Sequence, residues 1–145
     1  MTTDPTTASD AQNSSLGLIL LADDEPHITL VLARKLRSAG YDVVTAEDGE
    51  EAFECAKETP PTLVVTDLQM PFMTGLDLAR SLKAEASTSH IPVIMLTARG
   101  YVLDPGELVS TNIRFIMSKP FSAIEVVEKV AQLLASDGLE ERKSA

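Results

Sequence analysis

The chain is short of the residues on which several classes of protein depend. Its 145 residues include one cysteine and no tryptophan, and aromatic residues make up 4%. The single cysteine, Cys55, excludes an internal disulfide and a metal site built from several cysteines. Basic residues are also scarce, because 12 lysines and arginines stand against 22 acids and the net charge is -10. This charge argues against binding to nucleic acid or to an anionic membrane through bulk electrostatics.

Long hydrophobic runs are missing as well. The longest, residues 16–22 and 91–96, are far shorter than the ~20 apolar residues that span a bilayer. Residues 1–15 carry neither the basic start nor the apolar stretch of a signal peptide. We therefore expect a cytoplasmic protein with no membrane insertion. Residues 1–15, rich in Thr and Ser, are predicted to be a disordered lead, followed by one domain at 16–136 and a flexible tail at 137–145.

What the sequence does contain is a regular alternation of strand and helix patterns. Short apolar runs are each followed by a turn and an amphipathic stretch, which is typical of repeated βα units in an α/β protein. The predicted strands are residues 16–22, 41–46, 63–67, 91–96 and 113–117. The last helix is predicted to run through about Ala135, with an inner face of Ile124, Val127, Ala131 and Leu134. Right-handed crossovers place such helices on both faces of one parallel sheet.

Polar side chains follow the predicted strands at their carboxyl ends, where open α/β sheets place their chemistry. Asp23 and Asp24 follow the first strand, and Asp67 ends the third. Thr97 follows the fourth strand and Lys119 the fifth. Each has an ordinary structural explanation when taken alone, such as a turn cap or a solvated lysine. Because the carboxyl ends of parallel strands meet at one edge, we expect all five side chains to lie close together.

The charges of these residues favour a phosphoryl site with a metal. Three carboxylates at one edge repel one another, so a cation or protons must offset them. Oxygen ligands suit Mg²⁺ (or Mn²⁺) better than zinc. The carboxylate of Asp67 is ionised at pH 7 and is a suitable nucleophile toward phosphorus. The metal and Lys119 would neutralise a phosphoryl group there, and Thr97 would donate to one of its oxygens.

Four motifs, in this order and at this spacing, resemble the receiver domain of two-component response regulators. They are LGLILLADDE at residues 16–25, VVTDLQMP at 64–71, LTA at 96–98 and KPF at 119–121. The resemblance extends from about Leu16 to Leu134. It implies a flavodoxin-like (βα)5 fold, a doubly wound parallel sheet of five strands in the order 2-1-3-4-5.

The resemblance also implies a signalling role. Asp67 would be the phosphoacceptor, with Thr97 and Lys119 as the hydroxyl and the lysine beside it. The donor would be a histidine kinase or a histidine phosphotransfer protein in a phosphorelay. The chain would then signal to an unknown downstream protein through a change of its surface. Because only about eight residues follow the predicted last helix, we expect a stand-alone regulator, and no enzyme beyond self-phosphorylation and autodephosphorylation.

A metal site is implied in the same way. Its ligands would be Asp24, Asp67 and the backbone carbonyl of Gln69, with Asp23 nearby or bound through water. The resemblance further implies a cis peptide bond between Lys119 and Pro120.

One position departs from the family pattern. Three residues before the lysine the family usually has Tyr or Phe, which acts as a rotamer switch, whereas this chain has Ile116. Phe115 precedes it and faces the opposite side of the sheet by strand alternation. We expect Ile116 to stay packed, so that the signal passes through residues 97–105.

Three other functions compete with this interpretation. An aspartyl phosphatase needs a second acid two residues after the nucleophile, where this chain has Gln69. A flavin protein needs a phosphate-binding loop after the first strand, where this chain has two acids that would repel the phosphate. A degenerate receiver, which binds proteins without phosphotransfer, is the remaining alternative.

Overall fold

The computed structural model of the chain describes residues 15–98 and 100–144, with side chains up to residue 135. Strands and helices alternate along these residues. They are β1 (Leu18–Ala22), α2 (Pro26–Ser38), β2 (Asp42–Ala46), α3 (Gly49–Glu58), β3 (Leu63–Asp67), α4 (Gly75–Ala84), β4 (Val93–Thr97), α5 (Pro105–Ser110), β5 (Ile113–Ser118) and α6 (Ala123–Ser144). The predicted lead, apart from Ser15, lies outside the described residues.

The strands form one parallel sheet in the order β2-β1-β3-β4-β5, as expected. Its register aligns the carboxyl ends of neighbouring strands. Ala22 pairs with Ala46 on one side and with Thr66 on the other, and Thr97 pairs with Ser118. The residues that follow these positions therefore emerge at one edge of the sheet.

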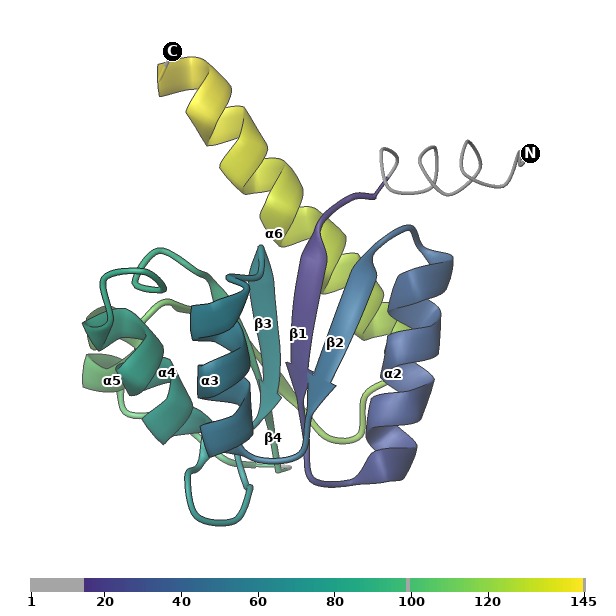
Figure 1. Cartoon of the computed structure of the whole chain (residues 1–145), viewed down its shortest axis with the longest axis vertical. Helices are drawn as coiled ribbons and strands as arrows, with labels where there is room; N and C mark the ends of the chain where they lie inside the picture. Colours follow the sequence, from purple (N-terminus) through teal and green to yellow (C-terminus); the bar gives the residue numbers. More distant parts are fainter. Residues whose placement is uncertain (1–14, 99, 145) are drawn as a thin grey trace.

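Helices cover both faces of the sheet, and each face has its own core (Figure 1). Strand alternation sends Leu20 and Val64 toward α3 and α4, and Leu21 and Val65 toward α2 and α6. The central strands are buried on both faces, and each begins with an apolar run without polar alternation, as such burial requires. The rigid double core fixes the strand ends on which the site is built.

Helix α6 differs from the sequence-based prediction in its inner face and in the position of its end. Val126, Val130 and Leu133 are buried, whereas Ile124 is 54% exposed and Ala131 is exposed. Of the predicted inner residues, Val127 and Leu134 do pack against the core, but they are only partly buried. Apolar residues occupy two adjacent stripes of this helix, so their spacing fits either register and packing against the sheet selects one. The helix also continues to Ser144 and does not end near Ala135. A glycine such as the one at 138 lowers helix stability by about 1 kcal/mol but does not by itself end a helix.

The residue at the usual switch position is more exposed than expected. Phe115 and Ile116 do face opposite sides of the sheet, as alternation predicts, because Phe115 packs in the core under α2 and α6. Ile116 pairs with Met95 on the other side and is 37% exposed, so the expectation that it is packed is wrong. None of the six residues of α5, all of which are described, is buried. Ile116 also lies on β5, an edge strand, which has a neighbouring strand on one side only.

Gly75 at the start of α4 packs directly against Asp67 at the end of β3. A Cβ atom at this position would lie 2.3 Å from the backbone oxygen of Asp67 and 2.9 Å from Sδ of Met95. We expect Gly75→Ala to lower the free energy of unfolding by about 2 kcal/mol or more, because backbone must move to admit the methyl group. Urea denaturation measures the change.

Gly106→Ala is the matched control for this substitution. The new Cβ would meet only Oδ1 of Asp104, at 3.6 Å, and Gly106 lies in the exposed helix α5. Its unfolding midpoint should equal or exceed that of the wild type. Equal midpoints for both variants would contradict the close packing at Gly75.

Candidate functional site

The structure brings the predicted polar residues of the strand ends together. Asp23, Asp24 and Asp67 each present a carboxylate oxygen, and these oxygens all lie within 4.8 Å of one another. Nζ of Lys119 lies 3.6 Å from Oδ1 of Asp67. Thr97 ends β4, the strand next to β3, and its side chain is fully buried. The arrangement is an acid cluster with one ammonium group beside it.

Local structure holds each of these residues in place. The backbone N–H of Glu25 donates to Oδ1 of Asp23 at 2.9 Å, and Pro26 starts α2 directly afterwards. The backbone N–H of Lys119 donates to the carbonyl of Thr97 at 2.9 Å, which holds the loop after β5 against β4. The peptide bond between Lys119 and Pro120 is cis, as the resemblance implied.

Two buried polar atoms at the site lack a hydrogen-bond partner among the described residues. They are Oδ2 of Asp23 and Oγ1 of Thr97, in side chains that are 1% and 0% exposed. A buried polar atom without a partner costs free energy, and native structures keep few of them. A cation would satisfy the carboxylate oxygen, and an anionic oxygen would satisfy the hydroxyl. A site that holds a metal ion and a phosphoryl group would provide partners for both atoms.

Burial makes the carboxylates hard to ionise when no cation is present. It raises the pKa of Asp23 to about 6, although the hydrogen bond from Glu25 partly opposes the shift. Burial likewise raises the pKa of Asp67, and the nearby charge of Lys119 opposes it. A bound divalent cation would favour the ionised forms of both groups. The donor set is thus the hard, all-oxygen set that suits Mg²⁺.

Glu25 belongs to the surroundings of the site, a place that its position in the sequence did not by itself predict. Its Oε1 lies 3.7 Å from Nζ of Lys119, so this lysine is shared between Glu25 and Asp67. The run of acids Asp23-Asp24-Glu25 was the available signal. The Glu25 side chain is 58% exposed, so the pair adds little stability. Gln69 follows Asp67 by two residues, and its side chain is exposed.

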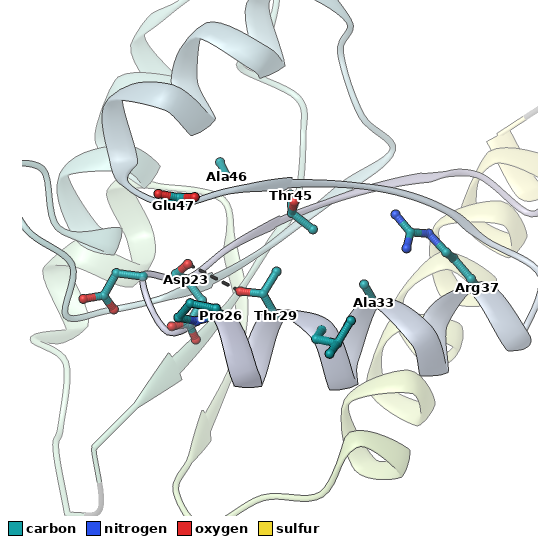
Figure 2. Close-up of a pocket in the computed structure, with 10 residues that line it drawn as sticks. Asp23, Pro26, Thr29, Ala33, Arg37, Thr45, Ala46 and Glu47 are labelled. Carbon is teal, nitrogen blue, oxygen red and sulfur yellow. Dashed lines mark hydrogen bonds between the residues drawn. The ribbon is translucent and has the colours of Figure 1, made fainter.

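A cleft of about 350 Å³ runs between α2 and β2 and ends at the acid cluster. Figure 2 shows Asp23 and Glu47 at one end and Arg37 at the other, with Thr45 between them. The guanidinium of Arg37 donates to the carbonyl of Val43 at 3.0 Å, which places its charge on the edge strand. Asp23 therefore belongs to both the acid cluster and the wall of an accessible cleft.

A doubly wound parallel sheet with an acid cluster, a buried threonine and a lysine at its carboxyl edge defines a class of signalling domains. The chain matches the response regulator receiver domain over residues 19–131, and it belongs to that family. The resemblance found in the sequence and the expected fold are both confirmed.

Relatives of known name agree with this membership. The chain is 36% identical over 116 residues to the alkaline phosphatase synthesis transcriptional regulatory protein PhoP of Bacillus subtilis, covering 80% of this chain and 48% of that protein. It is 35% identical over 121 residues to the probable transcriptional regulatory protein TcrX of Mycobacterium tuberculosis, covering 83% and 51%. The chain thus spans about half the length of these relatives.

Solved structures show the same fold over almost their whole length. A putative response regulator from Chloroflexus aurantiacus superposes with a TM-score of 0.75 at 29% identity, covering 82% of this chain and 98% of that one. The chemotaxis response regulator CheY4 of Vibrio cholerae gives a TM-score of 0.73 at 28% identity, covering 83% and 99%.

In the part of our chain that the structure describes, no helix is both long and apolar enough to cross a membrane.

Proposed function

We propose that this chain is a single-domain response regulator that accepts a phosphoryl group on Asp67 from a histidine kinase or a histidine phosphotransfer protein. The observation that supports this most is the setting of Asp67. Its side chain is 6% exposed, a lysine ammonium group lies 3.6 Å away, and two further carboxylates lie within 4.8 Å. Perturbed carboxylates that converge at the end of a strand mark functional sites.

The transfer needs no separate base. A carboxylate oxygen of Asp67 attacks the phosphorus of the phosphohistidine, and a new O–P bond forms while the P–N bond breaks. The histidine nitrogen keeps the electron pair of that bond. The ionised form of Asp67 is therefore the reactive form, and the charge of Lys119 favours it.

The surrounding residues are suited to the charge that develops on the phosphoryl oxygens. The ammonium group of Lys119 would neutralise one oxygen, and the unpartnered hydroxyl of Thr97 would donate to another. The carboxylates of Asp23, Asp24 and Asp67, with the backbone carbonyl of Gln69, would hold a Mg²⁺ or Mn²⁺ ion. The ion supplies positive charge that offsets the carboxylates and the phosphoryl oxygens.

We further propose that this role is not enzymatic beyond self-phosphorylation and autodephosphorylation, and that it is carried out in the cytoplasm. The net charge of -10 favours a protein over a nucleic acid as the downstream partner. The relatives are named as transcriptional regulators, but this chain spans only about half of them.

The segment between β4 and α5, with α5 itself, is the part that we propose to move on phosphorylation. It holds the exposed Gly100 at φ 82°, and no side chain of α5 is fully buried, although Leu108 packs partly against the core. Ile116 is already partly exposed, so it has little to gain by changing rotamer. Amide hydrogen exchange with and without beryllofluoride and Mg²⁺ should change in residues 100–110 and stay constant around Ile116. The opposite pattern would contradict the proposal.

The function itself is tested by incubating the wild type with acetyl phosphate and Mg²⁺ and recording its intact mass. One added phosphoryl group, lost in hydroxylamine as acyl phosphates are, is the expected result. A chain that stays unmodified, while a known receiver in the same buffer is labelled, would favour the protein-binding alternative. A panel of purified histidine kinases then identifies the donor.

A further inference from the structure

Thr66, directly before the phosphoacceptor, places a hydroxyl group inside an apolar layer. Its side chain is 0% exposed, and strand alternation directs it toward the core under α3 and α4. Its neighbours on the adjacent strands are Ala22 and Met95, which are both fully buried. Valine has nearly the same shape and no polar group that requires a hydrogen bond, so the presence of a hydroxyl in this layer calls for an explanation.

The hydroxyl donates a hydrogen bond to the backbone carbonyl of Asp67 at 3.0 Å. The other end of the same peptide unit is held as well, because the N–H of Leu68 donates to the carbonyl of Leu96 at 2.8 Å. Gly75 packs on this carbonyl from α4, so no side chain there can replace the hydroxyl as a donor. Both polar groups of the peptide after Asp67 are thus fixed.

The orientation of this peptide matters for the proposed chemistry. Rotation about the bond between Cα and the carbonyl carbon of Asp67 changes where its carboxylate lies relative to Gln69, two residues later. These two residues supply the nucleophile and one proposed metal ligand. A buried carbonyl without a donor lowers its free energy by turning toward another partner. Such a turn would move the carboxylate of Asp67 away from the backbone carbonyl of Gln69.

We propose that Thr66 is a positioning residue for phosphoryl transfer, which it serves by fixing the backbone of Asp67. This inference rests on the proposed function of Asp67 and adds a residue outside the charged site. Thr66 touches neither the phosphoryl group nor the metal, and it acts through the peptide that follows the phosphoacceptor.

Thr66→Val tests the proposal, because it removes the hydroxyl and keeps the shape. We expect the rate of labelling by acetyl phosphate to fall about tenfold, since small misplacements of reacting groups cost large factors in rate. The affinity for beryllofluoride at fixed Mg²⁺, measured by ¹⁹F NMR, should fall by a similar factor. Thr66→Ser keeps the hydroxyl and should restore both values to near those of the wild type.

Thr88→Val is the matched control. Thr88 is also 0% exposed, and its hydroxyl donates to the carbonyl of Leu82 at 2.7 Å, after α4 and away from the acid cluster. It should lose stability in urea as Thr66→Val does while its labelling rate stays at the wild-type value. If Thr66→Val does not fold, the comparison of Thr66→Ala with Thr66→Ser isolates the hydroxyl in the same way.

The possible results separate the two proposals. A labelled wild type with equal rates in all Thr66 variants would overturn the positioning role and leave the function of Asp67 standing. Equal loss of rate in Thr88→Val would also overturn it, because the effect would then come from stability alone. A wild type that is never labelled would overturn both.

Discussion

Asp67→Asn is expected to abolish labelling by acetyl phosphate. Asparagine keeps the shape of the side chain but lacks an anionic oxygen to attack phosphorus. The substitution also removes a buried negative charge that lies close to two other carboxylates, so the metal-free variant should be at least as stable as the wild type. Intact mass and thermal unfolding measure the two effects on the same sample.

Asp42→Asn is the control for this substitution. Asp42 is exposed at the start of β2, at the opposite edge of the sheet from the acid cluster. Its labelling rate should equal that of the wild type. Labelling of Asp67→Asn at the wild-type rate would show that the phosphoryl group goes elsewhere.

Asp24→Asn is expected to raise the Mg²⁺ concentration needed for half-maximal labelling about tenfold or more, and a chelator should stop labelling of the wild type. Asp24 is the exposed member of the cluster, so the substitution changes the charge of the site without changing the packing of the core. Mg²⁺ should also raise the unfolding temperature of the wild type by mass action, and raise that of the variant less.

Glu47→Gln provides a control of the same charge change. Glu47 is exposed on the wall of the neighbouring cleft and is not a member of the cluster. Its Mg²⁺ requirement should match that of the wild type. Equal shifts in both variants would mean that Mg²⁺ responds to net charge alone and not to a built site.

The Mg²⁺ requirement should also rise as the pH falls through about 6. The pKa of Asp23 lies near 6 in the metal-free protein, so below that value a proton occupies the carboxylate that the cation needs. Above it the carboxylate is ionised while its buried Oδ2 has no partner among the described residues, which destabilises the metal-free fold and favours metal binding. Titrations at several pH values measure this dependence.

Much of the site was open to prediction because it depends on local patterns. The run of Leu63, Val64 and Val65 before Asp67 marks a buried strand with an acid at its end. The ends of helices depend on local patterns in the same way. Thr74 with Asp77, and Ser122 with Glu125, form the reciprocal hydrogen bonds that their spacing predicts. Such features involve residues within a few positions of one another, so sequence spacing determines them.

Features that depend on contacts between distant elements were decided by the tertiary structure. The stripe of α6 that packs on the sheet holds Val126 and not Ile124, because both stripes are apolar and only the sheet distinguishes them. Ile116 is partly exposed on β5, which is an edge strand of the sheet. The approach of Glu25 to Lys119 likewise joins segments far apart in sequence, and the packing of Gly75 on Asp67 depends on the path of the loop between β3 and α4.

The sequence by itself therefore determined the alternating α/β pattern, the strand ends that carry Asp23, Asp67, Thr97 and Lys119, and the family to which the motifs point. Only the tertiary structure decided how close those charges lie, which buried oxygens lack partners, and that the Thr66 hydroxyl donates to the backbone carbonyl of Asp67. The physical reason is that periodicity records which side chains avoid water. Distances and hydrogen bonds between strands arise only when the sheet and its helices pack together.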